Sequence, residues 1–260
     1  MRVARLAGCL LAAGVLTAVL AVDPAVKEIS KTLDLAPDGR VSVDTYKGTV
    51  KVAGWDAPKV EIRARIEPEA GFWGTPQEGT EKTEIRIDAS SNSVRIKSDY
   101  SRVPRHWFGT TVLPFVHYEI RMPRTAHLAI KDHKSRTEVS GLKGEANIDT
   151  YKGTVEVTGL EGGLELETYK GEARVRFTHL QASSRFETYK GEIDVAIPGE
   201  NGFRIESDLG RRASLSSDFD LKQPARDSGR HGRRFSGDVN GGGPRVYLKS
   251  YKGDLKLRRS

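Results

Sequence analysis

The chain has 260 residues and a formal net charge of +7, from 42 Lys and Arg against 35 Asp and Glu. This length can bury a substantial core, and 27 Gly against two Met favours short strands and corners over helices. Because the modest positive charge is spread over residues of both signs, we do not expect nucleic acid as a partner.

Residues 1–21 have the pattern of a secretory signal peptide. Arg2 and Arg5 precede an uncharged stretch at 6–22, and Ala21 offers a small residue for cleavage. An uncleaved membrane anchor is the alternative, because 17 apolar residues stand at the lower edge of a membrane-spanning helix. We therefore predict export to the periplasm, the cell surface or the medium.

The segment Leu6-Ala7-Gly8-Cys9 resembles a lipoprotein box, although the apolar region follows the cysteine instead of preceding it. Membrane contact is expected only through an uncleaved signal or a lipidated Cys9. Cleavage would remove Cys9, so the mature chain would carry no disulfide, no thiol catalysis and no thiolate metal site. Its formal charge would fall from +7 to +5 with the loss of Arg2 and Arg5.

A linker at 22–40 and an N-terminal β region at 41–127 follow. Runs at 60–66, 84–87 and 94–97 alternate between apolar and polar residues, which is the pattern of half-buried strands. Two loops of this region are rich in aromatic residues, namely Trp73, Trp107 and Phe108. These side chains form either an exposed binding patch or a lid over one end of the core.

A repeated tetrapeptide dominates the rest of the chain. Thr-Tyr-Lys-Gly begins at Thr45, Thr150, Thr168 and Thr188, and Ser250 begins a fifth copy as Ser-Tyr-Lys-Gly. The three central copies start 18 and 20 residues apart (168−150 and 188−168), the length of a β-solenoid rung. Such a short repeat cannot bury its own apolar face, so each copy must stack on the next.

Apolar residues occupy fixed offsets around each copy. Val157, Val175 and Val195 follow the motif at the same offset and alternate with charged residues, which predicts short strands with one buried face. A glycine corner between two such strands makes most of a rung.

Degenerate copies extend the array in both directions. Asp132-His133-Lys134-Ser135 replaces the motif upstream, and Ser207-Asp208-Leu209-Gly210 replaces it downstream. We therefore expect six rungs in a β-solenoid at 128–260. A polar, breaker-rich stretch at about 222–244 is predicted to be an excursion loop.

The chain resembles the bacterial putative-adhesin domain family of unknown function. The resemblance rests on an alternating strand that ends in Met122-Pro123, on corners of the form Val-x-Gly-Leu-x-Gly, and on Asn240-Gly241-Gly242-Gly243-Pro244 before a final rung. It covers roughly 41–260. It implies an exported or membrane-tethered β-solenoid and no established activity. Here Tyr-Lys-Gly replaces the family's usual Ser-Gly-Asp or Ser-Gly-Glu corner, so the corner surface is more aromatic and more basic.

Stacking turns the repeat into a surface. With rungs about 4.8 Å apart, we expect the repeated tyrosines to form a ladder with the lysines beside it. This candidate ligand surface comprises Tyr151, Lys152, Tyr169, Lys170, Tyr189 and Lys190. It could bind sugar rings and anionic groups, or serve only as a scaffold whose lysines are neutralised by neighbouring acids.

An acidic column suggests an enzyme. Asp149, Glu167 and Glu187 share one offset, and neighbouring carboxylates could form a glycosidase pair or a Ca²⁺ site. However, the acids recur regularly instead of gathering at one place, and each has a lysine nearby. We find no metal-ligand, nucleophile or phosphate-binding motif, so we assign no catalytic residue, no metal and no cofactor.

The sequence thus predicts a non-catalytic, exported, all-β solenoid that binds or displays at the cell surface or envelope, with an anionic glycan or another envelope component as its partner. A structural or regulatory periplasmic module that binds another protein is the main alternative. A polysaccharide-acting enzyme is the third.

Overall fold

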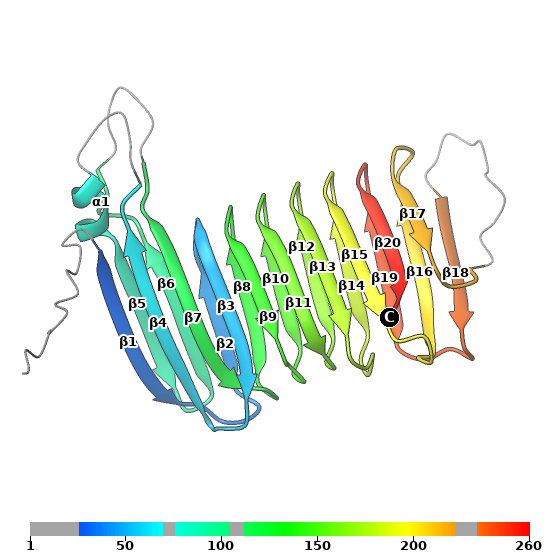
Figure 1. Cartoon of the computed structure of the whole chain (residues 1–260), viewed down its shortest axis with the longest axis horizontal. Coiled ribbons are helices and arrows are strands. Elements are labelled where there is room, and N and C mark those ends of the chain that lie inside the picture. The colour runs from blue at the N-terminus through cyan, green and yellow to red at the C-terminus, as the bar shows by residue number, and fades with distance from the viewer. Residues whose placement is uncertain (1–25, 70–75, 105–111, 222–232) are drawn as a thin grey trace, which may run out of the picture.

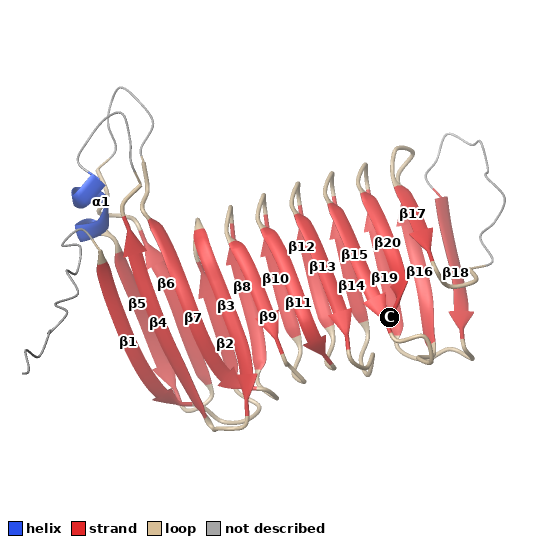
Figure 2. Cartoon of the chain, in the orientation of Figure 1, coloured by secondary structure: helices blue, strands red, loops and turns tan. Residues whose placement is uncertain are grey.

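The computed structural model describes residues 26–69, 76–104, 112–221 and 233–260. These residues form a nearly all-β stack of two facing sheets, each of ten strands within the described ranges. Figure 1 shows the strands side by side along the long axis of the molecule, and Figure 2 shows one short helix, α1 (Pro76–Lys82), at the end that holds the N-terminal strands. The predicted β-solenoid class is confirmed.

The first sheet lists in spatial order as β1 (Lys27–Asp34), β4 (Lys59–Glu67), β7 (Phe115–Pro123), β3 (Gly48–Trp55), β9 (Arg136–Ser140), β11 (Thr154–Leu160), β13 (Glu172–Phe177), β15 (Glu192–Ile197), β20 (Asp254–Arg259) and β17 (Ser214–Ser217). The second sheet lists from the same end as β5 (Glu84–Ser90), β6 (Ser93–Asp99), β2 (Arg40–Asp44), β8 (His127–Asp132), β10 (Ala146–Thr150), β12 (Leu164–Thr168), β14 (Ser184–Thr188), β19 (Arg245–Ser250), β16 (Phe203–Leu209) and β18 (Arg233–Val239).

A rung is one strand of the second sheet, a corner, and the next strand of the chain in the first sheet. Neighbouring rungs pair in parallel and in register, as Ile148 with Leu166 and Val157 with Val175 illustrate. Because equivalent offsets meet, Val157, Val175 and Val195 form one buried column, each 1% exposed or less. The six predicted rungs at 128–260 are present as β8/β9, β10/β11, β12/β13, β14/β15, β16/β17 and β19/β20. The predicted alignment of the downstream corner is wrong by two residues, because Leu209 and not Ser207 pairs with Ser250.

The stack also continues beyond the predicted start of the solenoid. Strand β2 pairs in parallel with β8, and β3 pairs in parallel with β9. Both sheets are therefore continuous across the predicted boundary between residues 127 and 128. The rungs β2/β3 and β6/β7 therefore belong to the same stack as the later ones. The first motif copy, Thr45 to Gly48, is the corner of β2/β3.

The spatial order of the rungs differs from their order in the chain at both ends. The last rung of the chain, β19/β20, lies between β14/β15 and β16/β17. At the other end, β2/β3 lies between the later rungs β6/β7 and β8/β9. Stacking in strict chain order, which the repeat suggests, is therefore not what the molecule does.

Antiparallel strands cover both ends, and two of them fall in segments predicted as irregular. Strand β1, within the predicted linker at 22–40, pairs with β4, which pairs with β7. Strand β18, within the predicted loop at 222–244, pairs with β16. Neither segment carries the repeat. Their alternation of apolar and polar residues is also interrupted on the face that points toward the core, by Lys31 in β1 and by Gly237 in β18. The part of that loop at 222–232 lies outside the described residues.

Candidate ligand-binding surface

The corner of each rung explains the composition of the motif. The backbone N–H of Gly153 donates to the side-chain oxygen of Thr150 at 2.9 Å, and the same bond recurs from Gly171 to Thr168 at 2.8 Å. It recurs again at the corners that begin with Thr188 and Ser250. These hydroxyls are buried, so they close the turn from inside the stack.

The glycine is required by the neighbouring rung. A Cβ placed on Gly171 would lie 2.0 Å from the carbonyl oxygen of Gly153, and one on Gly191 would lie 1.9 Å from that of Gly171. The corners therefore stack too closely for any side chain at this position.

The second residue of the motif builds the expected ladder. Tyr151 and Tyr169 stack with ring centroids 4.8 Å apart, and Tyr169 and Tyr189 stack at 4.7 Å with only 3° between their planes. The stack is longer than predicted, because Tyr251 continues it at 5.0 Å on one side and His133 at 4.7 Å on the other. Tyr46 closes it beyond His133, also at 4.7 Å. Six rings from six rungs form one continuous column, which we call the aromatic stack.

Two residues of the degenerate corner change the electrostatics inside the stack. Asp132 stands where the motif has Thr; its carboxylate accepts hydrogen bonds from the Ser135 N–H at 2.9 Å and the Thr150 hydroxyl at 3.1 Å. Burial nevertheless raises the pKa of Asp132 to about 6. The pKa of His133 is lowered by burial and by the charges of Lys134 and Lys152, which favours the neutral ring in the stack.

The lysine of the first corner, Lys47, pairs with Glu69, whereas the other corner lysines do not pair with any described acid. Lys152 lies over the ring of Tyr151 at 5.3 Å, Lys170 over Tyr169 at 5.4 Å, and Lys252 between two rings. Together with Lys134 and Lys190 they form the lysine column, none of whose members makes an ion pair with a described residue.

The acids expected to neutralise these lysines have other partners or none. Glu187 pairs with Lys249 at 3.0 Å, and Glu192 pairs with Lys256 at 2.7 Å. The salt-bridge ladder considered from sequence is therefore not formed. The aromatic stack and the lysine column together make a ridge along one edge of the molecule, which we call the Tyr–Lys ridge.

Stacking decides which parts of the tyrosines a ligand can reach. The faces of the inner rings are covered by one another, so only their edges and hydroxyls are open; Tyr169 is 37% exposed. Sugar rings therefore cannot stack along the ladder. Tyr251 is more open, at 56%, because Gly210 occupies the equivalent position of the next rung and carries no ring.

The acidic column lies on the outer face of the second sheet. Asp149, Glu167 and Glu187 are in register on neighbouring strands, as their offset predicted. Asp149 and Glu167 are exposed, and within the described ranges no three His, Cys, Asp or Glu side chains are placed to hold a metal ion.

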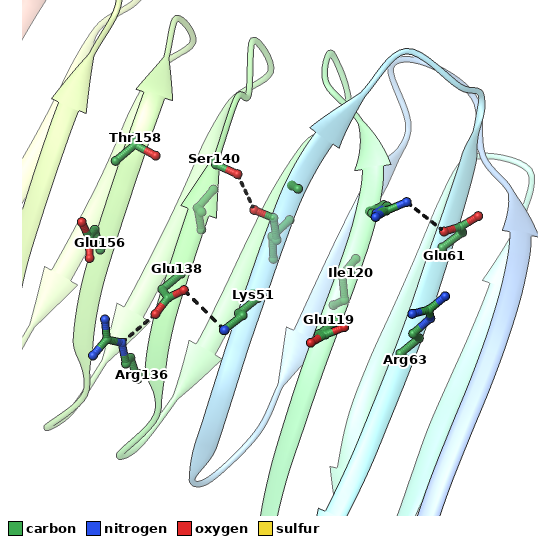
Figure 3. A pocket seen from close by; sticks show the side chains of 14 residues that line it. Lys51, Glu61, Arg63, Glu119, Ile120, Arg136, Glu138, Ser140, Glu156 and Thr158 are labelled. Atoms are coloured by element: carbon green, nitrogen blue, oxygen red, sulfur yellow. Dashed lines mark hydrogen bonds and ion pairs between the residues drawn. The ribbon is translucent and has the colours of Figure 1, made fainter. Parts of the chain in front are cut away.

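A hollow of about 460 Å³ lies on the opposite face, over β3, β9 and the strands beside them. Figure 3 shows its charged side chains, with Glu138 between Arg136, at 2.6 Å, and Lys51, at 3.9 Å. Ser140 donates to the Val52 carbonyl at 3.4 Å on the floor. The hollow mixes acids and bases, and the sequence patterns did not point to it because its residues come from rungs that are distant in the chain.

Some predicted features lie outside the described residues. These are Trp73, Trp107, Phe108, Cys9 and the signal peptide at 1–21. In the part of the chain that is described, no helix has both the length and the apolar character needed to cross a lipid bilayer.

Comparison with known proteins supports the fold. The model of the family described as Toastrack DUF4097 matches residues 118–258. A crystal structure of a putative cell adhesion protein from Clostridium sporogenes superposes with a TM-score of 0.53 at 12% identity, covering 90% of this chain and 100% of that one. A putative adhesin from Parabacteroides distasonis, also 12% identical, gives a TM-score of 0.26 over 89% of this chain and 97% of that one. No curated protein matches the chain.

Proposed function

The chain belongs to the Toastrack DUF4097 family, and on that premise we propose that it is a non-catalytic, exported protein that binds linear anionic polymers of the cell envelope along the Tyr–Lys ridge. An adhesin-like role agrees with the names of its structural neighbours.

The lysine column carries the proposal. Rungs repeat at the spacing of the stacked rings, 4.7 to 5.0 Å, so Lys134, Lys152, Lys170, Lys190 and Lys252 form a straight row of cations. Like charges this close repel each other, and none is relieved by an acid among the described residues. A polymer with regularly spaced anionic groups would relieve the repulsion at every rung.

The aromatic stack adds a second row of groups beside the lysine column. Tyr151, Tyr169 and Tyr189 are each fixed between two neighbouring rings, so their hydroxyls form a second, rigid row of hydrogen-bonding groups beside the cations. A rigid row loses little conformational entropy on binding, and several weak contacts along one polymer add as avidity. We therefore expect affinity to rise with polymer length.

The test is binding to polygalacturonate, with neutral dextran as the comparison polymer. The triple variant Lys152→Gln, Lys170→Gln, Lys190→Gln should bind polygalacturonate at least about tenfold more weakly, and wild-type binding should weaken as salt rises. A control triple, Lys59→Gln, Lys97→Gln, Lys131→Gln, removes the same charge from other surfaces and should bind like the wild type. Equal weakening in both triples, or no binding by the wild type, would reject the ridge as the site.

Export is the second part of the proposal. Replacing Leu10, Leu11 and Val15 with charged residues should keep the protein in the cytoplasm, because the apolar region would no longer be recognised. Mass spectrometry of the normal product should give the mature chain that begins after Ala21. A diacylated product beginning at Cys9 would instead establish a lipoprotein.

The hollow in Figure 3 favours a second candidate function, a module that binds another protein. Its alternating acids and bases suit a polar protein surface better than a uniformly charged polymer. Substituting Glu138→Arg would reverse the charge between Arg136 and Lys51. Loss of a cellular partner in this variant, with polygalacturonate binding unchanged, would establish a protein-binding site at the hollow that is separate from the Tyr–Lys ridge.

A further inference from the structure

The two sheets are offset by one strand along the stack. Beyond the rung β6/β7, the first sheet continues with β4 and β1, whereas the second continues only with β5. Beyond the rung β16/β17, the second sheet continues with β18, whereas the first ends at β17. Within the described residues, each end is therefore a step, with β1 projecting at one end and β18 at the other (Figure 1).

The two steps are complementary in shape and in strand direction. Strand β1 is antiparallel to β4 and β4 to β7, so β1 runs the same way as the rung strands of the first sheet, including β17. Strands β5 and β18 are each antiparallel to the rung strands of the second sheet, so they run the same way as each other. If a second copy follows the first by translation along the stack, β1 meets β17 and β5 meets β18, both in parallel.

The edges are also compatible in charge. Strand β17, Ser214-Leu215-Ser216-Ser217, carries no charge, and β1 carries two lysines and two acids. Strand β18 carries two arginines and one aspartate, whereas β5 carries two acids and one arginine. The second sheet would therefore be joined by edges of opposite net charge, +1 and −1. Natural edge strands are usually protected by charge, and the uncharged β17 lacks that protection.

Apolar side chains at both steps are only partly covered. Phe235 on β18 and Leu215 on β17 pack against the core at one end, and Ile29, Leu33, Ile85 and Ile87 do so at the other. Phe235 points inward, opposite Ser207 of β16, and the first sheet has no described strand across from it. If the two ends joined, each projecting strand would gain a facing strand in the other sheet, and these apolar side chains would be covered.

We propose that this chain associates head to tail, the step formed by β17 and β18 of one copy fitting the step formed by β1 and β5 of the next. A foreign strand would fill only one half of a step, whereas a second copy fills both halves at the same sheet separation. The interface is heterologous, so it produces an open series of dimers, trimers and longer rods.

Lys31 sets the strength of the joint. It lies opposite Ile62, on the inward face of β1 between Ile29 and Leu33, and is exposed at the step. Burying this ammonium group in the joint is costly, so we expect weak, reversible association. Lys31→Leu should shift assembly to at least about tenfold lower concentration.

Sedimentation velocity over the micromolar to millimolar range tests the proposal. The wild type should form a concentration-dependent series of species, and Lys31→Leu should form it at lower concentration. Phe235→Lys at one step and Ile87→Lys at the other should each leave a monomer, whereas the control Thr154→Lys, exposed on β11 in the middle of the stack, should assemble like the wild type. A wild type and a Lys31→Leu variant that both remain monomeric throughout would overturn the proposal.

Cysteine pairs identify which edges meet. In a Cys9→Ser background, Ser216→Cys on β17 and Thr32→Cys on β1 both lie on the outer face of the first sheet. A disulfide should form only when the two variants are mixed. Cross-linking of Ser216→Cys with itself would show a symmetric β17–β17 dimer and reject the head-to-tail joint.

Discussion

Asp132 occupies a position that the five copies of the motif give to Thr or Ser. Burial raises its pKa to about 6, above the ordinary value of 3.8 for this side chain, so the folded state binds the proton more tightly than the unfolded state. The contribution of this group to the free energy of unfolding is therefore largest below about pH 4 and falls as the pH rises to about 6. Asp132→Asn should raise the free energy of unfolding at pH 7 by roughly 1 to 3 kcal/mol.

Urea unfolding of both proteins between pH 4 and pH 8 checks this expectation. The difference between Asp132→Asn and the wild type should appear as the pH rises through this range, because only the wild type must carry a buried charge. Glu167→Gln, exposed on β12 and one strand further from Asp132 than β10, serves as the control and should not change this slope. A constant difference at all pH values would contradict the assignment to Asp132.

Gly171 illustrates how the neighbouring rung selects a residue. Gly171→Ala would place a methyl group 2.0 Å from the Gly153 carbonyl oxygen, and because both groups are backbone-anchored, the rungs would have to separate. We expect a loss of more than about 2 kcal/mol in the free energy of unfolding. Gly237→Ala is the matched control, since nothing lies within 4 Å of its Cβ position. Equal thermal stability of the two variants would show that the corners are looser than described.

The buried column of valines is an element-scale property, because each member packs through the strand on either side. Val175 is 1% exposed and pairs with Val157 and Val195. Val175→Asp would put an unpaired carboxylate into an apolar column and should cost several kcal/mol, roughly 3 or more. Thr154→Asp, at an exposed position, should leave the melting temperature nearly unchanged. Cooperative melting of Val175→Asp near the wild-type temperature would contradict the register.

The aromatic stack is the second element-scale property. Tyr169→Ala removes two ring contacts, those with Tyr151 and Tyr189, and should lower the free energy of unfolding by about 1 to 3 kcal/mol. Tyr169→Phe keeps both rings in contact and should be close to the wild type in stability. Near-ultraviolet circular dichroism should report the broken stack in the alanine variant alone. A phenylalanine variant as unstable as the alanine variant would mean that the hydroxyl, not the stacking, matters.

The sequence predicted the strands and the ring stack correctly in the segments that carry the repeat. The offsets of Val157, Val175 and Val195 predicted the strands, their buried face and their register, because a two-residue period and a fixed rung length leave little freedom. The repeated tyrosine likewise predicted the ladder. His133 as a member of the stack was visible in the aligned degenerate corner but was not recognised, because histidine is not an obvious substitute for tyrosine.

Other features could not be read from the sequence. The closest atom to a Cβ on Gly171 would be the carbonyl oxygen of the adjacent rung, at 2.0 Å, ahead of the Thr168 hydroxyl of its own turn at 2.7 Å, and the distance to that carbonyl depends on the separation of the rungs. The lysine column has no acidic partners partly because two nearby acids are paired with other lysines, Glu187 with Lys249 and Glu192 with Lys256. Those two lysines lie about 60 residues away in the chain, so the sequence pattern does not reveal the pairing. Strands β1 and β18 were missed because neither carries the repeat.

On the scale of the whole molecule, the strands β16, β17 and β18 depend on the rung β19/β20, because that rung lies between them and the rest of the stack. Deleting residues 244–260 removes the strands to which β16 and β17 are paired in parallel. Hydrogen exchange of the truncated protein should show no protection of the backbone amides in β16–β18. Protection should persist in β8–β13, because all the strands with which they pair, including β2, β3, β14 and β15, remain in the truncated chain. Retained protection of β16 in the truncated protein would mean that it can dock directly on β14.

The order of the rungs explains why topology resisted prediction more than secondary structure did. The four corners that begin with Thr150, Thr168, Thr188 and Ser250 form the same turn hydrogen bond and the same ring stack, so each of them is compatible with any of the others as a neighbour. Local patterns therefore fix what a rung is without fixing which rung it touches.

The inserted rung also separates the order of synthesis from the order in space. Residues 245–259 are synthesised after β16, β17 and β18, yet they occupy an internal layer of the stack. Strands β16 and β17 have no parallel neighbour until that layer is made, so this end of the stack cannot be completed before residues 245–259 have been synthesised. A chain that stops before residue 245 therefore leaves β14 and β15 as exposed strand edges, because β19 and β20 are the strands that pair with them.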